Sequence, residues 1–116
     1  MNGFHTGLAA EEIAERGYRA LDCEILAHRW RGTAGEIDLI ADTGHTIVFA
    51  EVKARKSIAE AAHAISPRQQ SRMANTALEY LERHGLGGRE MRFDAVLVDR
   101  QGRSEIRENA IVFDIW

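Results

Sequence analysis

The alternation of apolar and polar residues is strongest over residues 35–54, where it predicts two strands joined by a tight turn. Residues 35–41 and 46–54 are rich in β-branched and aromatic side chains, which pleated sheets favour. Residues 42–45 form the predicted turn, in which Gly44 can take a positive φ at no steric cost. Apolar side chains fall on both faces of this hairpin, so we expect a sheet that is covered on both sides.

Helical periodicity appears on either side of the hairpin. Residues 7–21 carry apolar side chains at helical spacing and predict a first helix. Ser66 is a good N-cap and Pro67 a good first helical residue, so a main helix is predicted from there to just before Gly85. The alanine-rich residues 58–65 predict a short helix or helical loop.

Further strands are predicted before and after these elements. Residues 23–31 and 91–99 are apolar enough to be strands, and the second should run parallel to residues 46–54 because a helix precedes it. Residues 105–113 predict an edge strand or two short strands. The expected architecture is a single α/β domain over residues 1–116, with a central mixed β-sheet flanked by helices in the order αβββ(α)αββ.

Four charged residues stand inside the apolar runs of the hairpin: Glu36, Asp38, Glu51 and Lys53. If Asp42 pairs with His45, Glu36 lies opposite Glu51. Asp38 then lies diagonal to Glu51, roughly 7 Å away and on the same face. Lys53 shares that face because it follows Glu51 by two residues. Ile37 and Leu39 point to the opposite face in this register.

Three carboxylates beside one ammonium group need compensation, because like charges repel and an unpaired buried charge costs several kcal/mol. A divalent cation would supply it, and carboxylate oxygens suit Mg²⁺ or Mn²⁺. A lysine next to such an ion can orient an attacking water or stabilise charge that develops on a phosphate.

The spacing of Asp38 to Glu51-Val52-Lys53 resembles the PD-(D/E)xK motif of the restriction-endonuclease-like fold. The longer strings GEIDLIA, VFAEVKAR and RFDAVLV resemble the YraN family of small predicted nucleases over about residues 7–113. This resemblance implies a restriction-endonuclease-like fold and metal-dependent hydrolysis of phosphodiester bonds. Asp38 and Glu51 would then bind Mg²⁺ or Mn²⁺, and Lys53 would orient the nucleophilic water.

The resemblance also implies roles for residues outside the hairpin motif. Glu11 matches a helix glutamate that joins the metal shell in related nucleases, although a solvent-exposed role is equally compatible with its position. Glu36 would hold a second-shell position. Gln69 stands where the family usually has lysine, so it keeps hydrogen bonding but loses charge. Asp94 matches the family's RFD string and is expected to be structural, pairing with Arg92 or capping a neighbour.

Positively charged and polar residues after and before the hairpin suggest a rim that binds phosphates, with a solvated surface as the alternative. The candidates for this nucleic-acid rim are Arg31, Arg55, Lys56, Arg68, Gln69 and Arg72. Trp30 is expected to pack into the core. The chain has 15 basic residues, of which only Lys53 and Lys56 are lysines, so the lysine at position 53 indicates a role that arginine would not fill.

Composition narrows the functional classes. The formal net charge of −3 argues against a protein that coats nucleic acid, but it allows a local basic groove. One cysteine, Cys23, excludes an intrachain disulfide. No apolar run approaches a membrane span and the first residues do not resemble a signal peptide, so we expect a cytoplasmic protein without a membrane partner.

The leading interpretation is a nuclease that acts on nucleic acid, with DNA favoured over RNA. A nuclease this small would cut two strands most simply as a homodimer. The alternative is a non-catalytic nucleic-acid-binding module on a nuclease scaffold. A structural protein whose charged residues form a closed ion-pair cluster is a third reading.

Overall fold

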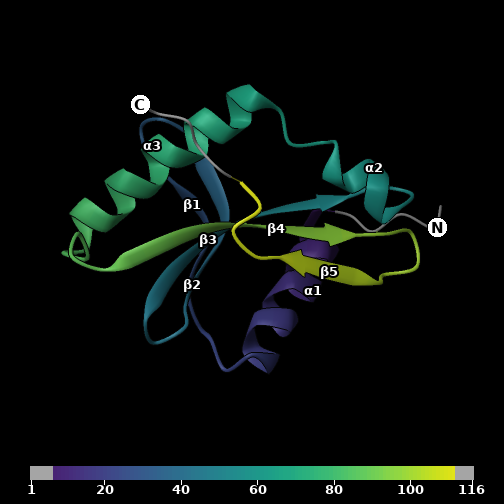
Figure 1. Ribbon diagram of the computed structural model, residues 1–116, viewed down its shortest axis with the longest axis horizontal. Helices are drawn as coiled ribbons and strands as arrows, with labels where there is room; N and C mark the ends of the chain where they lie inside the picture. The colour runs from purple at the N-terminus through teal and green to yellow at the C-terminus, as the bar shows by residue number, and fades with distance from the viewer. Residues whose placement is uncertain (1–6, 112–116) are drawn as a thin grey trace.

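The computed structural model describes residues 7–111, and its elements follow the predicted order (Figure 1). They are α1 (Gly7–Ala20), β1 (Glu24–Arg31), β2 (Glu36–Asp42), β3 (Thr46–Ala54), α2 (Ile58–Ala62), α3 (Pro67–Arg83), β4 (Glu90–Val98) and β5 (Ser104–Arg107). The prediction of a strand over 105–113 is wrong in its extent, because a turn with Asn109 at a φ of 52° follows β5. Residues 112 and 113 lie outside the described residues.

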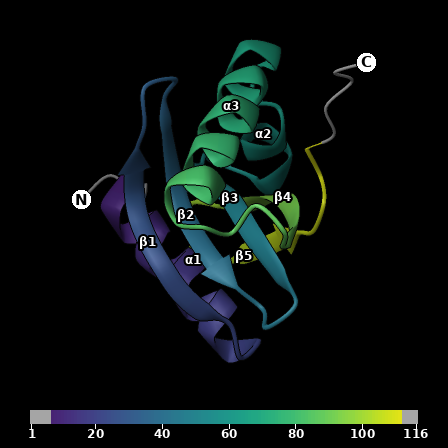
Figure 2. The ribbon, with the colours of Figure 1, turned by 90° about the vertical axis from the view of Figure 1, so that its left-hand side faces the viewer.

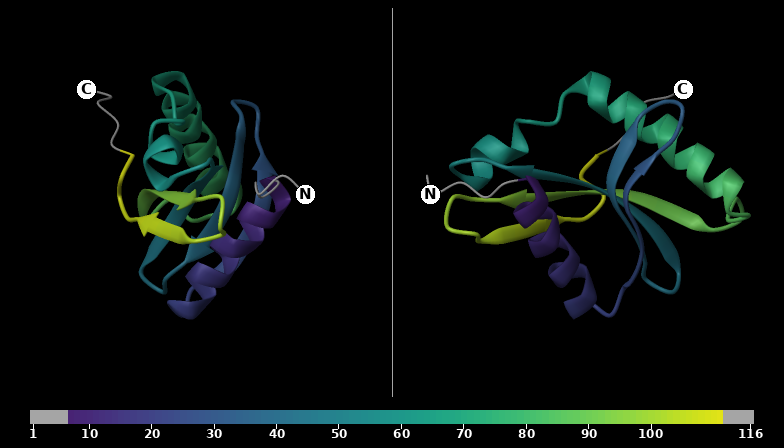
Figure 3. Two further views of the ribbon diagram at one scale, coloured as in Figure 1. Left: turned by 90° about the vertical axis from the view of Figure 1, so that its right-hand side faces the viewer. Right: turned by 180° about the vertical axis from the view of Figure 1, so that it is seen from behind.

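The five strands form one mixed sheet in the order β1-β2-β3-β4-β5. β3 and β4 are parallel, as predicted, and the other neighbours are antiparallel. α1 covers one face of the sheet, whereas α2 and α3 cover the other (Figures 1 and 3). The predicted mixed sheet between helices is therefore confirmed. No helix in residues 7–111 is long and apolar enough to cross a membrane.

Local signals account for both ends of α3. The Ser66 hydroxyl accepts a hydrogen bond from the backbone N–H of Gln69 at 3.1 Å, and Pro67 is the first helical residue. After Arg83 the chain leaves the helix through Gly85, which has a φ of 67°. The predicted start and end of this helix are confirmed.

The hairpin of β2 and β3 has a different register from the predicted one. The ladder runs from Asp42 paired with Ile47 to Leu39 paired with Ala50, so Asp42 does not pair with His45. The reason is a turn that lies one residue later along the chain than predicted, around Gly44 and His45. The Asp42 carboxylate accepts from the N–H of Gly44 at 2.8 Å, and the Thr43 N–H donates to the carbonyl of Thr46 at 3.1 Å.

This register changes the relation between the charged residues. Continuing the ladder by one step places Asp38 opposite Glu51 rather than diagonal to it. The expected pairing of Glu36 with Glu51 is wrong for the same reason. Beyond Leu39 and Ala50, β2 stays paired with β1 as far as Glu36, while β3 stays paired with β4 as far as Ala54. The β1–β2 hairpin bends away from β3 at this point (Figure 3).

The backbone of β1 is irregular beside that separation. His28 pairs with Leu39 and Trp30 with Ile37, but Arg29 between them has a φ of 47°, in the left-handed region. Ile37 consequently packs with α3, whereas Leu39 packs with α1. The prediction that these two side chains share a face is wrong, because it assumed strict alternation along β2.

α3 holds the end of the β1–β2 hairpin in place. The Glu79 carboxylate accepts hydrogen bonds from the backbone N–H of Thr33 at 2.8 Å and from its hydroxyl at 3.0 Å. Trp30 packs in the core against Tyr80, with ring centroids 5.1 Å apart, as expected. Figure 2 shows the β1–β2 hairpin with α1 and α3 on opposite sides of it.

Candidate active site

A hollow of about 470 Å³ lies where β2 and β3 separate, and we call it the β2–β3 hollow. Residues from α1, β2, β3 and α3 contribute to its wall, so it draws together segments that are distant in the sequence. The lining residues are Ala10, Glu11, Asp38, Glu51, Val52, Lys53, Ala54, Arg55 and Gln69. The lining of the hollow therefore includes all three residues of the predicted catalytic set, Asp38, Glu51 and Lys53.

Asp38 spans the gap that opens between the strands. Its Oδ2 accepts a hydrogen bond of 2.8 Å from the backbone N–H of Val52. The side chain thus takes the place of a backbone partner at the point where the β2–β3 ladder ends. This contact fixes one carboxylate oxygen of Asp38 and holds the carboxylate beside β3.

Glu51 is the most buried ionisable group of the hollow, with a side chain only 5% exposed. Its Oε2 lies 3.2 Å from Lys53 Nζ and accepts a hydrogen bond from the side-chain amide of Gln69. Burial raises the pKa of Glu51 to about 8, helped by the negative charge of Asp38 and a hydrogen bond to it. The ammonium group of Lys53 opposes this rise in pKa but does not cancel it.

The three residues of the motif are therefore brought together as predicted, with two carboxylates and one ammonium group around one hollow. When one carboxylate raises the pKa of another, a cation bound between the two stabilises the negative charge of both. Strongly shifted pKa values of this kind are concentrated at functional sites. Their catalytic and metal-binding roles remain predictions.

Glu11 lines the same hollow but has a different partner. Its Oε1 lies 2.7 Å from Nε of Arg29, and its side chain is 13% exposed. Within residues 7–111, no three His, Cys, Asp or Glu side chains lie close enough together to hold a metal ion. Glu11 therefore stands apart from Asp38 and Glu51, and its place in a metal shell remains a prediction.

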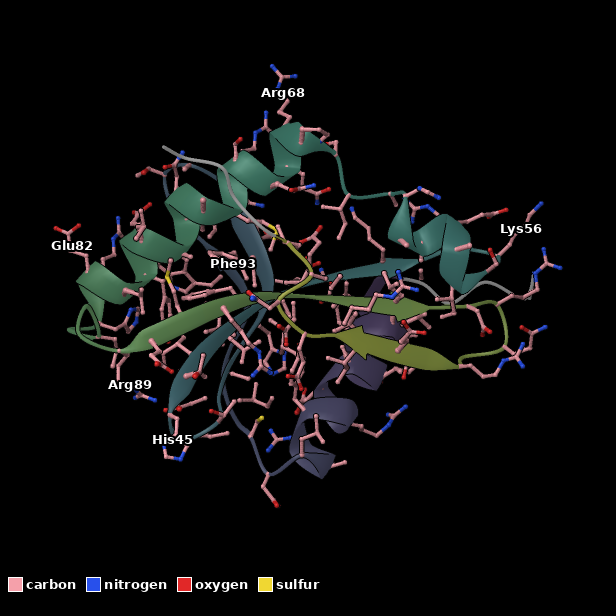
Figure 4. All side chains as sticks on the ribbon, in the orientation of Figure 1. His45, Lys56, Arg68, Glu82, Arg89 and Phe93 are labelled. Atoms are coloured by element: carbon pink, nitrogen blue, oxygen red, sulfur yellow. The ribbon has the colours of Figure 1, made fainter. Side chains whose placement is uncertain are left out.

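The structure separates the predicted rim residues into two groups. Arg55 and Gln69 line the hollow. Arg31 instead pairs with Glu36, the predicted second-shell residue, at 3.0 Å on the exposed end of the β1–β2 hairpin. The remaining three rim residues, Lys56, Arg68 and Arg72, are outside the lining of the hollow. Lys56, in the loop before α2, and Arg68, in the first turn of α3, both point outward (Figure 4).

Sequence reasoning missed two groups that bind carboxylates of the hollow. The backbone N–H of Val52 donates to Asp38, and a pattern of side chains does not predict which backbone N–H will act as a donor. Arg29 binds Glu11 from a left-handed backbone conformation that its residue type does not favour. The amide of Gln69 shows that this position contacts Glu51 without the positive charge of lysine.

Comparison with known proteins identifies the relatives of this chain. The sequence model described as "Uncharacterised protein family UPF0102" matches residues 10–98. A UPF0102 protein of Dinoroseobacter shibae is 47% identical over 105 residues, which are 90% of this chain and 78% of the relative. A UPF0102 protein of Cereibacter sphaeroides is 50% identical over 105 residues, 90% of each chain. One from Ruegeria is 46% identical over 110 residues, 94% of this chain and 89% of the relative.

Proposed function

Because the chain belongs to the uncharacterised protein family UPF0102, which is the YraN type and whose name states no activity, we infer its function from the β2–β3 hollow. The function is metal-dependent hydrolysis of phosphodiester bonds in nucleic acid, by a domain of the restriction-endonuclease-like class. DNA is the favoured substrate. The observation that carries this inference is the grouping of Asp38, Glu51 and Lys53 around one hollow.

The donor groups of the hollow fit a small divalent cation. Mg²⁺ commonly binds one or two carboxylates and keeps several waters, and Asp38 and Glu51 supply two carboxylates. Burial and the negative charge of Asp38 raise the pKa of Glu51 despite the neighbouring Lys53, and a bound cation would stabilise both carboxylates in their charged form. Asp38 and Glu51 would therefore hold Mg²⁺ or Mn²⁺. Such an ion, when bound, supplies an acidified water and positive charge for the phosphate oxygens.

Neighbouring residues of the chain support this arrangement. The N–H of Val52 and the amide of Gln69 orient the carboxylates of Asp38 and Glu51. Lys53 lies beside Glu51, and its ammonium group would orient the attacking water and offset negative charge on the phosphate. Arg55 lies in the wall of the hollow, where it would contact a neighbouring phosphate.

A cleavage screen with Mn²⁺ tests this function on branched, single-stranded and duplex DNA and on RNA. The informative variant is Asp38→Asn, which keeps the shape of the side chain and removes its charge. The matched control is Asp42→Asn, on the same strand but outside the hollow, where Asp42 pairs with Arg89 at 2.7 Å. We expect cleavage by the wild type and the control and its loss in Asp38→Asn. Equal cleavage by Asp38→Asn, or no cleavage of any substrate by the wild type, would contradict the proposal.

A second candidate function, a non-catalytic nucleic-acid-binding module, is favoured by one observation. Glu51 already contacts Lys53 and Gln69, and no buried side-chain nitrogen or oxygen in residues 7–111 lacks a hydrogen-bond partner. A protein of this kind would bind nucleic acid equally well in Mn²⁺ and in chelator, without turnover. Fluorescence anisotropy with labelled substrates in both buffers separates it from the nuclease.

A further inference from the structure

Arg29 adopts a backbone conformation that arginine does not favour. Three non-glycine residues in the described part of the chain have a positive φ: Asp22, Arg29 and Asn109. Aspartate and asparagine tolerate the left-handed region well, and those two residues lie in turns. Arg29 lies inside β1. Unfavourable backbone geometry of this kind persists where surrounding contacts outweigh it, and it is concentrated at functional sites.

The position of Arg29 relates it directly to the β2–β3 hollow. It lies between His28 and Trp30, whose partners Leu39 and Ile37 flank Asp38 in the neighbouring strand. Its guanidinium reaches α1, where Nε binds the Glu11 carboxylate at 2.7 Å. Arg29 therefore connects the strand next to Asp38 with the helix that forms one wall of the hollow.

The partner of Arg29 is a third carboxylate of the hollow that does not join the other two. Glu11 lines the hollow with Asp38 and Glu51, yet in residues 7–111 no three such side chains, these included, lie close enough together to hold one metal ion jointly. The Glu11 side chain is largely shielded from water, so its negative charge needs a cationic partner. Arg29 is the partner that it has.

We propose that Arg29 is a positioning residue that holds Glu11 on the wall of the β2–β3 hollow, away from the cation site at Asp38 and Glu51. The proposal rests on the cation site of the proposed function but not on cleavage. With Arg29 present, a divalent cation is bound by two carboxylates. Without the guanidinium, Glu11 turns to the bound cation in the same hollow and becomes a third carboxylate ligand.

Calorimetric titration with Mn²⁺ alone tests this role. The variant Arg29→Asn removes the guanidinium, and asparagine tolerates the left-handed backbone. We expect it to bind Mn²⁺ about tenfold more tightly than the wild type, because affinity rises with the number of charged ligands. Arg31→Asn is the matched control. It removes the same charge two residues along β1, where Arg31 pairs with Glu36 on the surface, and should leave the affinity unchanged.

Variants of Glu11 separate positioning from a simple charge effect. Glu11→Gln alone should weaken Mn²⁺ binding less than threefold, because Glu11 is not a ligand while Arg29 holds it. In the Glu11→Gln background, Arg29→Asn should give no gain in affinity. A gain that survives in this background would assign the effect to the lost positive charge and overturn the proposal. A tenfold loss on Glu11→Gln alone would overturn it without needing any variant of Arg29 to fold.

The outcomes also distinguish this inference from the proposed function. Unchanged or weaker Mn²⁺ binding by Arg29→Asn, in a protein that still cleaves DNA, overturns the role of Arg29 alone. Tighter binding by Arg29→Asn, in a protein that cleaves nothing, supports the role of Arg29 and contradicts the nuclease. No Mn²⁺ binding by any variant overturns the positioning role and the cation site together.

Discussion

Two buried carboxylates lie in adjacent parallel strands, one step apart in the ladder, and their surroundings differ. Asp94 on β4 pairs with Ala50, and the next pair joins Ala95 to Glu51 on β3. Asp94 is fully buried and accepts hydrogen bonds from the Tyr18 hydroxyl at 2.8 Å and Arg92 Nε at 3.0 Å. It also accepts one from the backbone N–H of Asn109 at 2.9 Å. Glu51 instead faces the carboxylate of Asp38.

This difference shows how similar burial leads to a structural role in one place and a candidate site in the other. The donors around Asp94 join α1, β4 and the segment after β5, and the expected structural role of Asp94 is confirmed. Burial and the charge of Asp94 raise the pKa of Tyr18, so this phenol stays a hydrogen-bond donor. Next to Glu51, β2 contributes the negative charge of Asp38 instead. Burial and this charge together raise the pKa of Glu51.

The largest expected effect is on stability, and it tests the difference between Asp94 and Glu51 directly. Asp94→Asn should lower the free energy of unfolding by about 3 to 5 kcal/mol, because it removes the buried negative charge that pairs with Arg92 and leaves that guanidinium only the exposed Glu108 at 3.7 Å. Glu51→Gln, a change of the same size one ladder step away, should leave stability equal or higher without metal, since it removes repulsion from Asp38. Urea unfolding in chelator measures both. A comparable loss of unfolding free energy in the two variants would contradict a difference in role between Asp94 and Glu51.

The second effect concerns pH and uses the same pair of proteins. The pKa of Glu51 is raised from 4.5 to about 8 in the folded state, so the folded protein binds the extra proton more tightly than the unfolded chain. The stability that depends on this proton is fully present below pH 4.5 and is lost as pH rises toward 8. Its loss should be on the order of 4 kcal/mol between pH 5 and about 8.5, because the loss approaches about 1.4 kcal/mol for each pH unit between the two pKa values.

Unfolding in chelator between pH 5 and about 8.5 measures this effect. Relative to the wild type, Glu51→Gln should become progressively more stable as pH rises through that interval. If the free energies of unfolding of the wild type and Glu51→Gln changed in parallel with pH, the pKa of Glu51 would not be raised by folding. The contrast with Asp94 would then disappear.

The third effect tests whether Lys53, beside Glu51, has a catalytic role. Lys53→Arg keeps a positive charge beside Glu51 but replaces a compact ammonium group with a planar guanidinium. Cleavage should fall about 10²-fold or more, the usual cost of removing a positioned catalytic group. Affinity for nucleic acid should change little, since a cation remains. Cleavage at the wild-type rate would exclude a catalytic role for Lys53.

The smallest effect is stabilisation by metal. At about ten times its dissociation constant, Mn²⁺ should raise the free energy of unfolding by about 1.4 kcal/mol, because it binds the folded protein alone. Asp38→Asn should abolish this gain, whereas Asp94→Asn should keep it, since the Asp94 cluster is already neutralised. Thermal unfolding with and without Mn²⁺ checks this. An unchanged midpoint at millimolar Mn²⁺ in the wild type would count against the site.

Local patterns in the sequence determined the order of the elements and the bounds of several of them. β3 covers the predicted residues 46–54, and α3 begins directly after its N-cap Ser66 and ends shortly before Gly85. The chemical identity of the candidate site also followed from sequence, because Asp38, Glu51 and Lys53 interrupt otherwise apolar strands. These signals are local, since they depend on periodicity and on side chains that bind their own backbone.

Tertiary structure decided which of these groups meet. A turn held by Asp42 and Thr43 set the hairpin register, so Asp38 lies opposite Glu51 in its continuation. The left-handed backbone at Arg29 accompanied the change of face at Ile37 and brought a guanidinium to Glu11. These features depend on contacts between residues far apart in the chain, whose energies outweigh local preferences. Periodicity cannot reveal them, because it assumes that every residue of a strand keeps the same backbone geometry.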